Sequence, residues 1–64
     1  MITVNGVVHD LAGRTVREVI DALSMNDRGV AVAIDGDVVT KSRWDTTTID
    51  DGAAIEVVTA VAGG

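Results

Sequence analysis

The chain opens with the alternation of apolar and polar residues that is typical of a half-buried strand, at Ile2, Thr3 and Val4. Asn5-Gly6 separates this stretch from a second run over residues 7–10, which begins with Val7-Val8. Asn-Gly between two such runs is a strong signal for a β-hairpin, because the tight turn needs positive φ at both of its central residues. We therefore predict a hairpin over residues 2–10.

A helical pattern follows the hairpin. Thr15 and Glu18 have the spacing of a capping box, in which the Thr15 hydroxyl accepts the Glu18 N–H and the Glu18 carboxylate accepts the Thr15 N–H. Apolar residues then recur at helical spacing: Val16, Val19, Ile20 and Leu23. We predict a helix of about ten residues, which must pack against a sheet because so short a helix is marginal alone.

Turn residues and short apolar runs alternate through the second half. The polar stretch 24–29 ends in glycine and predicts the helix exit and a loop. Residues 30–34 predict a strand with its large side chains on one face and its small ones on the other. A turn over residues 35–37 leads to a short fourth strand that begins at Val38-Val39.

The next connection is irregular or contains a single helical turn. It covers residues 40–45, and Ser42 is the candidate N-cap of that turn. Trp44 is the chain's only aromatic residue, and we expect it to fill the core or its rim, since it alone can bury a large area. A loop over residues 46–50 and a turn at Asp51-Gly52 then lead into the final strand.

The last stretch is an apolar run rich in β-branched residues that ends in Gly63-Gly64. Its continuous apolar character suits a central strand. Glycine has no Cβ, so the two glycines could enter a narrow channel and leave the terminal carboxylate unshielded. We predict one domain over residues 1–62 and a flexible tail over residues 63–64, with the Gly64 carboxylate as the working group.

The order strand, strand, helix, strand, short strand, strand predicts an α+β fold. The final strand should lie beside the first and parallel to it, in a mixed four- to five-stranded sheet with the helix packed across one face. This arrangement is a β-grasp, or ubiquitin-like, roll. Glu56 should avoid the helix side, which assigns the following residues to the core face: Ile55, Val57, Thr59 and Val61.

The opposite face of the final strand then carries small apolar residues. Val58 and Ala60 should lie there, beside Ala31 and Ala33 of the third strand. Scattered exposed apolar residues are normal on protein surfaces, but a contiguous patch that leads to the tail would suit a docking surface. The candidate partner-binding residues are Val58, Ala60 and Ala62.

Composition excludes several kinds of site. The chain has no cysteine, hence no thiol nucleophile, redox pair or iron–sulfur cluster, and His9 alone cannot build a metal site. No residues have the spacing of a catalytic acid–base pair or of an activated nucleophile, so we do not expect an enzyme. The net charge of −5 argues against nucleic acid as a partner. With no signal peptide and no membrane-spanning run, we expect a cytoplasmic protein with no membrane partner.

The acidic residues are concentrated toward the C-terminus. From Asp45 onward there are four of them and no basic residue: Asp45, Asp50, Asp51 and Glu56. Such a stretch is commonly a solvated surface that keeps a small protein soluble. The alternative is that this end of the molecule is steered toward a basic protein partner.

Several of these motifs, taken in order, resemble the ThiS family of sulfur carrier proteins of thiamine biosynthesis. They are Val4-Asn5-Gly6, the stretch 29–36, Trp44, Asp51-Gly52 and the stretch 56–64 with its final Gly-Gly. The similarity extends over essentially the whole chain. The chain departs from the family at Thr40-Lys41, where Pro-Arg is common, and at Ala53, where aspartate is common.

The resemblance implies a carrier that other enzymes act on. A ThiF-like adenylating enzyme would use ATP to activate the Gly64 carboxylate as an acyl-adenylate. A persulfide from a cysteine desulfurase or sulfur relay protein would replace the adenylate and leave a thiocarboxylate. Thiazole synthase would then take the sulfur into the thiazole ring of thiamine. ATP would be used by the activating partner, and the carrier itself would bind no cofactor.

Three alternatives remain open at this point. The small subunit of molybdopterin synthase uses the same tail chemistry with a different acceptor, although the chain is short for it and lacks phenylalanine. A sulfur carrier of another pathway, such as cysteine formation, would have the same sequence features. A β-grasp interaction module with an inert tail would belong to a different functional class.

Overall fold

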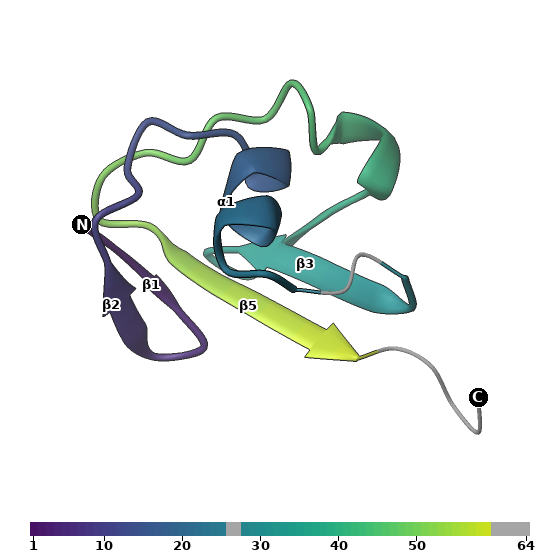
Figure 1. The fold of residues 1–64 in the computed structure, drawn as a ribbon, viewed down its shortest axis with the longest axis horizontal. Helices are drawn as coiled ribbons and strands as arrows, with labels where there is room; N and C mark the ends of the chain where they lie inside the picture. The colour runs from purple at the N-terminus through teal and green to yellow at the C-terminus, as the bar shows by residue number, and fades with distance from the viewer. Residues whose placement is uncertain (26–27, 60–64) are drawn as a thin grey trace.

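A computed structural model, which describes residues 1–25 and 28–59, contains a five-stranded mixed sheet with one helix on one face (Figure 1). The strand order is β2-β1-β5-β3-β4. The elements are β1 (Ile2–Val4), β2 (Val7–His9), α1 (Val16–Ala22), β3 (Val30–Ile34), β4 (Asp37–Val39), the 3₁₀-helix η1 (Lys41–Arg43) and β5 (Ala54–Thr59). The predicted order of strands and helix is confirmed.

β5 is the central strand of the sheet. It pairs parallel with β1 at Thr3↔Ala54 and Val4↔Ile55. On its other side it pairs antiparallel with β3 over five residue pairs, from Val30↔Thr59 to Ile34↔Ile55. The last strand therefore lies beside the first and parallel to it, with α1 across the sheet, which is the predicted β-grasp arrangement (Figure 1).

Each of the two hairpins has a two-residue turn in which both residues have positive φ. Asn5 and Gly6 have φ of 51° and 84°, so the predicted hairpin between β1 and β2 is confirmed. Asp35 and Gly36 have φ of 49° and 89° and join β3 to β4 in the same way. The predicted turn over residues 35–37 was one residue too long, because Asp37 already belongs to β4 and pairs with Ile34.

The helix begins where the sequence predicts and ends early. The Thr15 hydroxyl accepts the Glu18 N–H at 3.2 Å, and the Thr15 N–H donates to Glu18 Oε1 at 2.9 Å, which completes the capping box. The prediction of about ten residues was wrong, because α1 has seven. Ser24 adopts a left-handed φ of 54°, and its N–H donates to the Asp21 carbonyl while the Met25 N–H donates to the Ile20 carbonyl. This Schellman pattern closes the helix.

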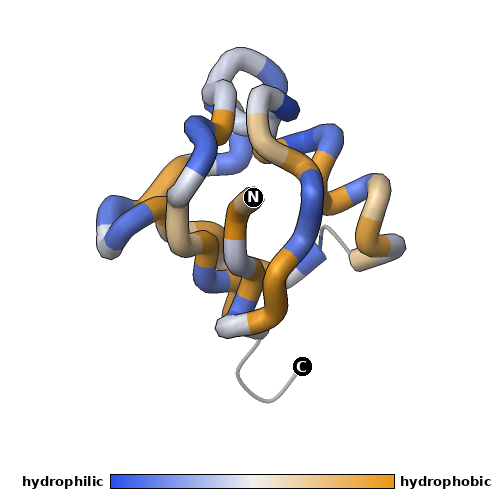
Figure 2. Tube along the Cα trace, turned by 90° about the vertical axis from the view of Figure 1, so that its left-hand side faces the viewer, coloured by the Kyte–Doolittle hydropathy of each residue, from blue (hydrophilic) through white to orange (hydrophobic). Residues whose placement is uncertain are grey.

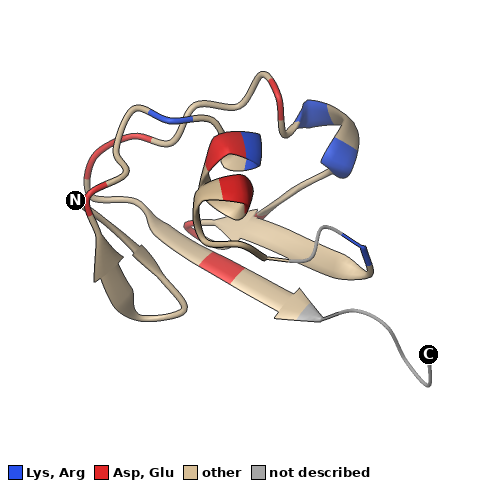
Figure 3. Ribbon diagram, viewed as in Figure 1, with Lys and Arg blue, Asp and Glu red and all other residues tan. Residues whose placement is uncertain are grey.

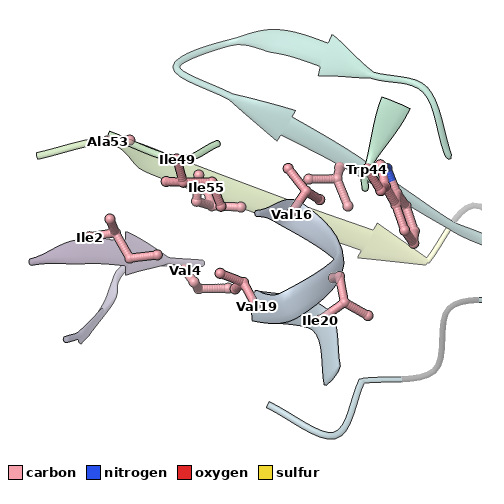
Figure 4. Close-up of a cluster of buried hydrophobic side chains, with 10 residues drawn as sticks. Ile2, Val4, Val16, Val19, Ile20, Trp44, Ile49, Ala53 and Ile55 are labelled. Atoms are coloured by element: carbon pink, nitrogen blue, oxygen red, sulfur yellow. The ribbon is translucent and has the colours of Figure 1, made fainter. Parts of the chain in front are cut away.

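One core lies between α1 and the sheet (Figure 4). Its buried apolar residues are Ile2, Val4, Val16, Val19, Ile20, Val32, Trp44, Ile49, Ala53 and Ile55. Apolar residues recur between polar ones along the chain (Figure 2). Core residues therefore come from every part of the sequence, from Ile2 to Ile55. Burial of these side chains is the main stabilising term for a chain without disulfides.

Trp44 is part of this core, as predicted, with 1% of its surface exposed. Its indole Nε1–H donates to the Val39 carbonyl at 3.1 Å, so the polar end of the ring is satisfied. The Arg17 guanidinium carbon lies 5.2 Å and Lys41 Nζ 5.9 Å from the ring centroid. Burial and these contacts fix the position of η1, which leads directly into Trp44.

Ser42 does not cap the helical turn that the sequence predicted. The turn is η1, and Ser42 lies inside it. Thr40 is the N-cap residue, with extended backbone (φ −67°, ψ 149°); its hydroxyl makes no capping hydrogen bond but lies 3.3 Å from the Ser42 hydroxyl. The chain enters the turn earlier than predicted, because the position of Trp44 in the core determines where the turn lies.

Candidate functional site

The candidate site is the face of the sheet opposite α1, called the open face below. Ala31 lies opposite Val58 and Ala33 opposite Glu56 in the antiparallel ladder, so these four side chains share one face. Val38 of β4 pairs with Ala33 and joins them. Val58 is 54% exposed and Val38 73% exposed. The predicted division of β5 into a core face and an open face is confirmed for the side chains that the structure describes.

A shallow hollow of about 120 Å³ lies on the open face. It is lined by Ala31, Val32, Ala33, Val38, Glu56 and Val58. Small-molecule pockets typically enclose about 300–1,000 Å³, so this hollow is better matched to one inserted side chain than to a cofactor. Glu56 contributes the single charged group at its rim.

The other predicted site residues follow β5 in the chain. Ala60, Ala62, Gly63 and Gly64 lie outside the described residues, as does Val61. The described part of β5 ends at Thr59. Of the predicted site residues, Val58 is the one that the structure places, on the open face beside the hollow.

The acidic stretch that the sequence groups near the tail is dispersed in space. Asp51 pairs with the amino group of Met1 at the start of β5, and this hydrogen bond and positive charge lower the pKa of the Asp51 carboxyl. Asp45 Oδ1 lies 3.3 Å from Arg17 Nε. Of the four acidic residues, only Glu56 lines the open-face hollow.

The alternative that this end of the molecule is steered toward a basic protein partner stays a prediction. β5 has six residues and spans about 20 Å, so Asp51, three residues before Ala54, lies far from the end of the strand at Thr59. Basic residues lie nearer its C-terminal end: Arg28 is two residues before Val30, which pairs with Thr59. Figure 3 shows acidic residues near the N-terminus, on α1 and beside η1, and it shows the lysine and arginines of η1 and of the connection to β3 on the side of the molecule where β5 ends.

Two turn side chains contact the backbone of β5, and the sequence did not predict either contact. Asn5 Oδ1 accepts the Val57 N–H at 2.8 Å, and Asn5 Nδ2 donates to the Val57 carbonyl at 3.1 Å. Asp35 Oδ1 accepts the Ala54 N–H at 2.9 Å. The only signal in the sequence is the Asn-Gly and Asp-Gly turn chemistry itself, which does not indicate the bonding partner.

The described residues contain no group of three or more histidine, aspartate or glutamate side chains that could hold a metal ion. No helix among them is long and apolar enough to cross a membrane. What the described part of the site offers is an apolar surface on a rigid central strand that leads directly to residues 60–64.

Comparison with known proteins identifies the family. A sequence model of the ThiS family matches residues 2–64. The chain belongs to the ThiS family. A ThiS relative, the sulfur carrier protein ThiS of Escherichia coli (strain K12), is 34% identical over 53 residues, which cover 83% of this chain and 80% of the relative.

Solved ThiS structures share the fold. The crystal structure of the thiamine biosynthesis protein ThiS from Geobacter metallireducens matches with a TM-score of 0.81 and 33% identity, over 98% of this chain and 97% of that chain. The solution structure of a thiamine biosynthesis protein from the same organism matches with a TM-score of 0.73 and 33% identity, over 98% and 86% of the two chains. The five-stranded β-grasp fold is thus that of ThiS proteins.

Proposed function

We propose that this chain is a sulfur carrier of thiamine biosynthesis and that the carboxylate of Gly64 carries the sulfur. The observation that supports this most directly is the ThiS family match over residues 2–64, which includes the final Gly63-Gly64. The Escherichia coli relative, a sulfur carrier protein, supports the same role.

The proposed chemistry starts by activating a carboxylate, which is a poor electrophile. A Gly64 carboxylate oxygen attacks the α-phosphorus of ATP in an adenylating partner, and pyrophosphate leaves. The terminal sulfur of a persulfide, delivered by a cysteine desulfurase or relay protein, attacks the acyl carbon, and AMP leaves. A thiol then reduces the resulting acyl disulfide to the thiocarboxylate. The carrier has no cysteine of its own that could compete for the sulfur.

Two features of the chain fit this role. Gly63 and Gly64 have no Cβ, which allows the terminus to enter the active sites of an adenylating enzyme and of thiazole synthase in turn. The open face with Val58, continued in sequence by Ala60 and Ala62, is the proposed docking surface for these enzymes. Its hollow can receive one apolar side chain of the partner.

The first test is the intact mass of the protein after incubation with ATP, an adenylating enzyme and a persulfide source. We expect a gain equal to the replacement of one oxygen by sulfur. A chain that lacks Gly64 is the control and should show no gain. If the full chain shows none, while the same enzyme and sulfur source modify another carrier, the proposal is wrong.

A second test concerns the tail. Gly63→Val should reduce the rate of adenylation at least tenfold, because a β-branched side chain restricts the backbone and widens the tail, while the thermal unfolding midpoint stays unchanged. Gly63→Ala is the graded control and should have a smaller effect. The rate is measured as pyrophosphate release. A normal rate for Gly63→Val would count against a narrow channel.

The acceptor is tested with the thiocarboxylated protein. Sulfur transfer to a thiazole synthase supports the thiamine pathway. Transfer only to a molybdopterin precursor or to a cysteine-forming enzyme would assign the carrier to that pathway instead. If a chain without Gly63 and Gly64 retains its partner binding and its cellular role, the chain is an interaction module with an inert tail.

A further inference from the structure

The two hairpin turns bond to different halves of the central strand. Asp35, in the turn between β3 and β4, contacts Ala54, the first residue of β5. Asn5, in the turn between β1 and β2, contacts Val57 through both its Oδ1 and its Nδ2. One turn therefore holds the start of β5, and the other holds the part of β5 that precedes the C-terminal residues.

The Asn5 side chain takes the place of a missing strand residue. β1 ends at Val4, and the Asn5 N–H makes the last backbone bond to β5, to the Ile55 carbonyl at 2.9 Å. A longer β1 would next accept the Val57 N–H and donate to the Val57 carbonyl. The amide of asparagine has the carbonyl and the N–H of a peptide group, so it can satisfy both. A left-handed φ of 51° turns the backbone away while the side chain stays beside β5.

This contact is the last one on the β1 side of β5. Among the described residues, only β3 borders β5 beyond Val57, through the pairs Ala31↔Val58 and Val30↔Thr59. Without the Asn5 amide, the last hydrogen bond on the β1 side would be at Ile55. The part of β5 that is held from one side only would grow by two residues, or about 7 Å.

We propose that Asn5 is a positioning residue, which holds the C-terminal half of β5 through Val57 and so fixes the part of the strand from which the chain continues to Gly64. This inference rests on the proposed function, because the purpose of fixing that part is to deliver Gly64 to the adenylating partner. Asn5 acts through the backbone of Val57 and touches no reacting atom. A strand end that is already fixed loses less freedom when the partner binds it, which lowers KM rather than raising kcat.

The test compares Asn5→Gly with Asp35→Gly. Both variants leave a Gly-Gly turn that accepts positive φ at both positions, so the hairpins should form, and each removes the side-chain bonds from a turn to β5. Asn5→Asp is the partial rescue, because its carboxylate can still accept the Val57 N–H but cannot donate to the Val57 carbonyl. The measurements are KM and kcat for the full-length chain, from pyrophosphate release with ATP and an adenylating enzyme, and amide hydrogen exchange at Val57.

We expect Asn5→Gly to raise KM about three- to tenfold with kcat within twofold of wild type, in line with the loss of two ordinary hydrogen bonds. Val57 amide exchange should become at least tenfold faster. Asn5→Asp should lie between Asn5→Gly and wild type in both measurements. Asp35→Gly should lower the unfolding midpoint but leave KM and Val57 exchange within twofold of wild type.

Equal KM values for Asn5→Gly and Asp35→Gly would overturn the inference, because the effect would then be one of general stability. Unchanged Val57 exchange in Asn5→Gly would also overturn it. If the wild-type chain is not adenylated at all, the proposed function fails first, and Val57 exchange still reports whether the Asn5 bonds exist. If the wild type is adenylated and Asn5→Gly behaves like it, only the present inference is wrong.

Discussion

The two faces of β5 differ in burial: one face packs in the core, and the other is exposed. Toward α1, Ile55 is 2% exposed and Val57 is half-buried against the core. On the open face, Glu56 and Val58 are exposed, although each lies next to a core residue in the chain. The period of two along a strand separates the two roles completely. One strand thus supplies the centre of the core and, on its other face, a surface that folding does not require to be buried.

The difference teaches which substitutions the fold can tolerate. A change on the α1 face alters packing in a core that has ten buried residues in the described part of the chain, and the domain is too small to have a large reserve of stability. A change on the open face alters mainly what a partner would meet. Stability and partner binding should therefore respond to different residues of the same strand.

The largest expected effect on stability is that of Ile55→Ala. Removing most of a fully buried side chain should lower the free energy of unfolding by about 3 kcal/mol, from lost burial and the cavity left behind. Urea denaturation monitored by Trp44 fluorescence measures it. Val58→Ala, on the open face, is the control and should change the same quantity by less than about 0.5 kcal/mol. Equal losses in the two variants would show that the faces are not energetically distinct.

A second effect separates binding from stability. Val58→Asp should weaken binding to an adenylating enzyme about tenfold or more, because it places a charge in the proposed apolar contact, while the domain still folds. Affinity is measured by titration calorimetry. Val8→Asp makes the same change at a strand residue that is 61% exposed and lies on β2, two strands away from β5. If both variants bind as wild type does, Val58 is not part of a docking surface.

The smallest effect concerns the helix on the core side of the sheet. The Thr15 N–H, which donates to the Glu18 carboxylate, lowers the pKa of Glu18 in the folded state. The ionised Glu18 carboxylate therefore contributes fully to folding stability above the ordinary glutamate pKa, and this stability is lost as the pH falls through the lowered pKa. Glu18→Gln keeps an acceptor without the charge. The urea midpoints of the two proteins should differ at pH 7 and converge toward pH 3, and a difference that does not change with pH would contradict this.

The sequence predicted the structural features that depend on residues close together in the chain. Asn5-Gly6 specified its own turn, Thr15 and Glu18 specified the start of the helix, and the alternation in β5 placed Val58 on the open face. Each of these signals is complete within a few residues, so tertiary contacts did not change the outcome.

The features that the sequence did not reveal depend on contacts between distant segments. Ile49 lies in a stretch that reads as a polar loop, yet it is fully buried, because backbone bonds join it to Gly13 (2.7 Å) and Arg14 (2.8 Å). The bonds from Asn5 to Val57 span 52 residues. Ser24 is a local exception: it ends the helix in a left-handed conformation that glycine usually occupies, which its residue type did not predict.

The central position of β5 also has a consequence for how the protein is made. Among the described residues β5 is the last strand in the sequence, and within the sheet it lies between the pair β2-β1 and the pair β3-β4. The five-stranded sheet therefore cannot be completed until residues 54–59 have left the ribosome. A chain that stops short of β5 has no strand to complete its sheet and should be degraded as an unfolded product. Every folded molecule has therefore been translated through β5, so folding itself selects against early-terminated chains.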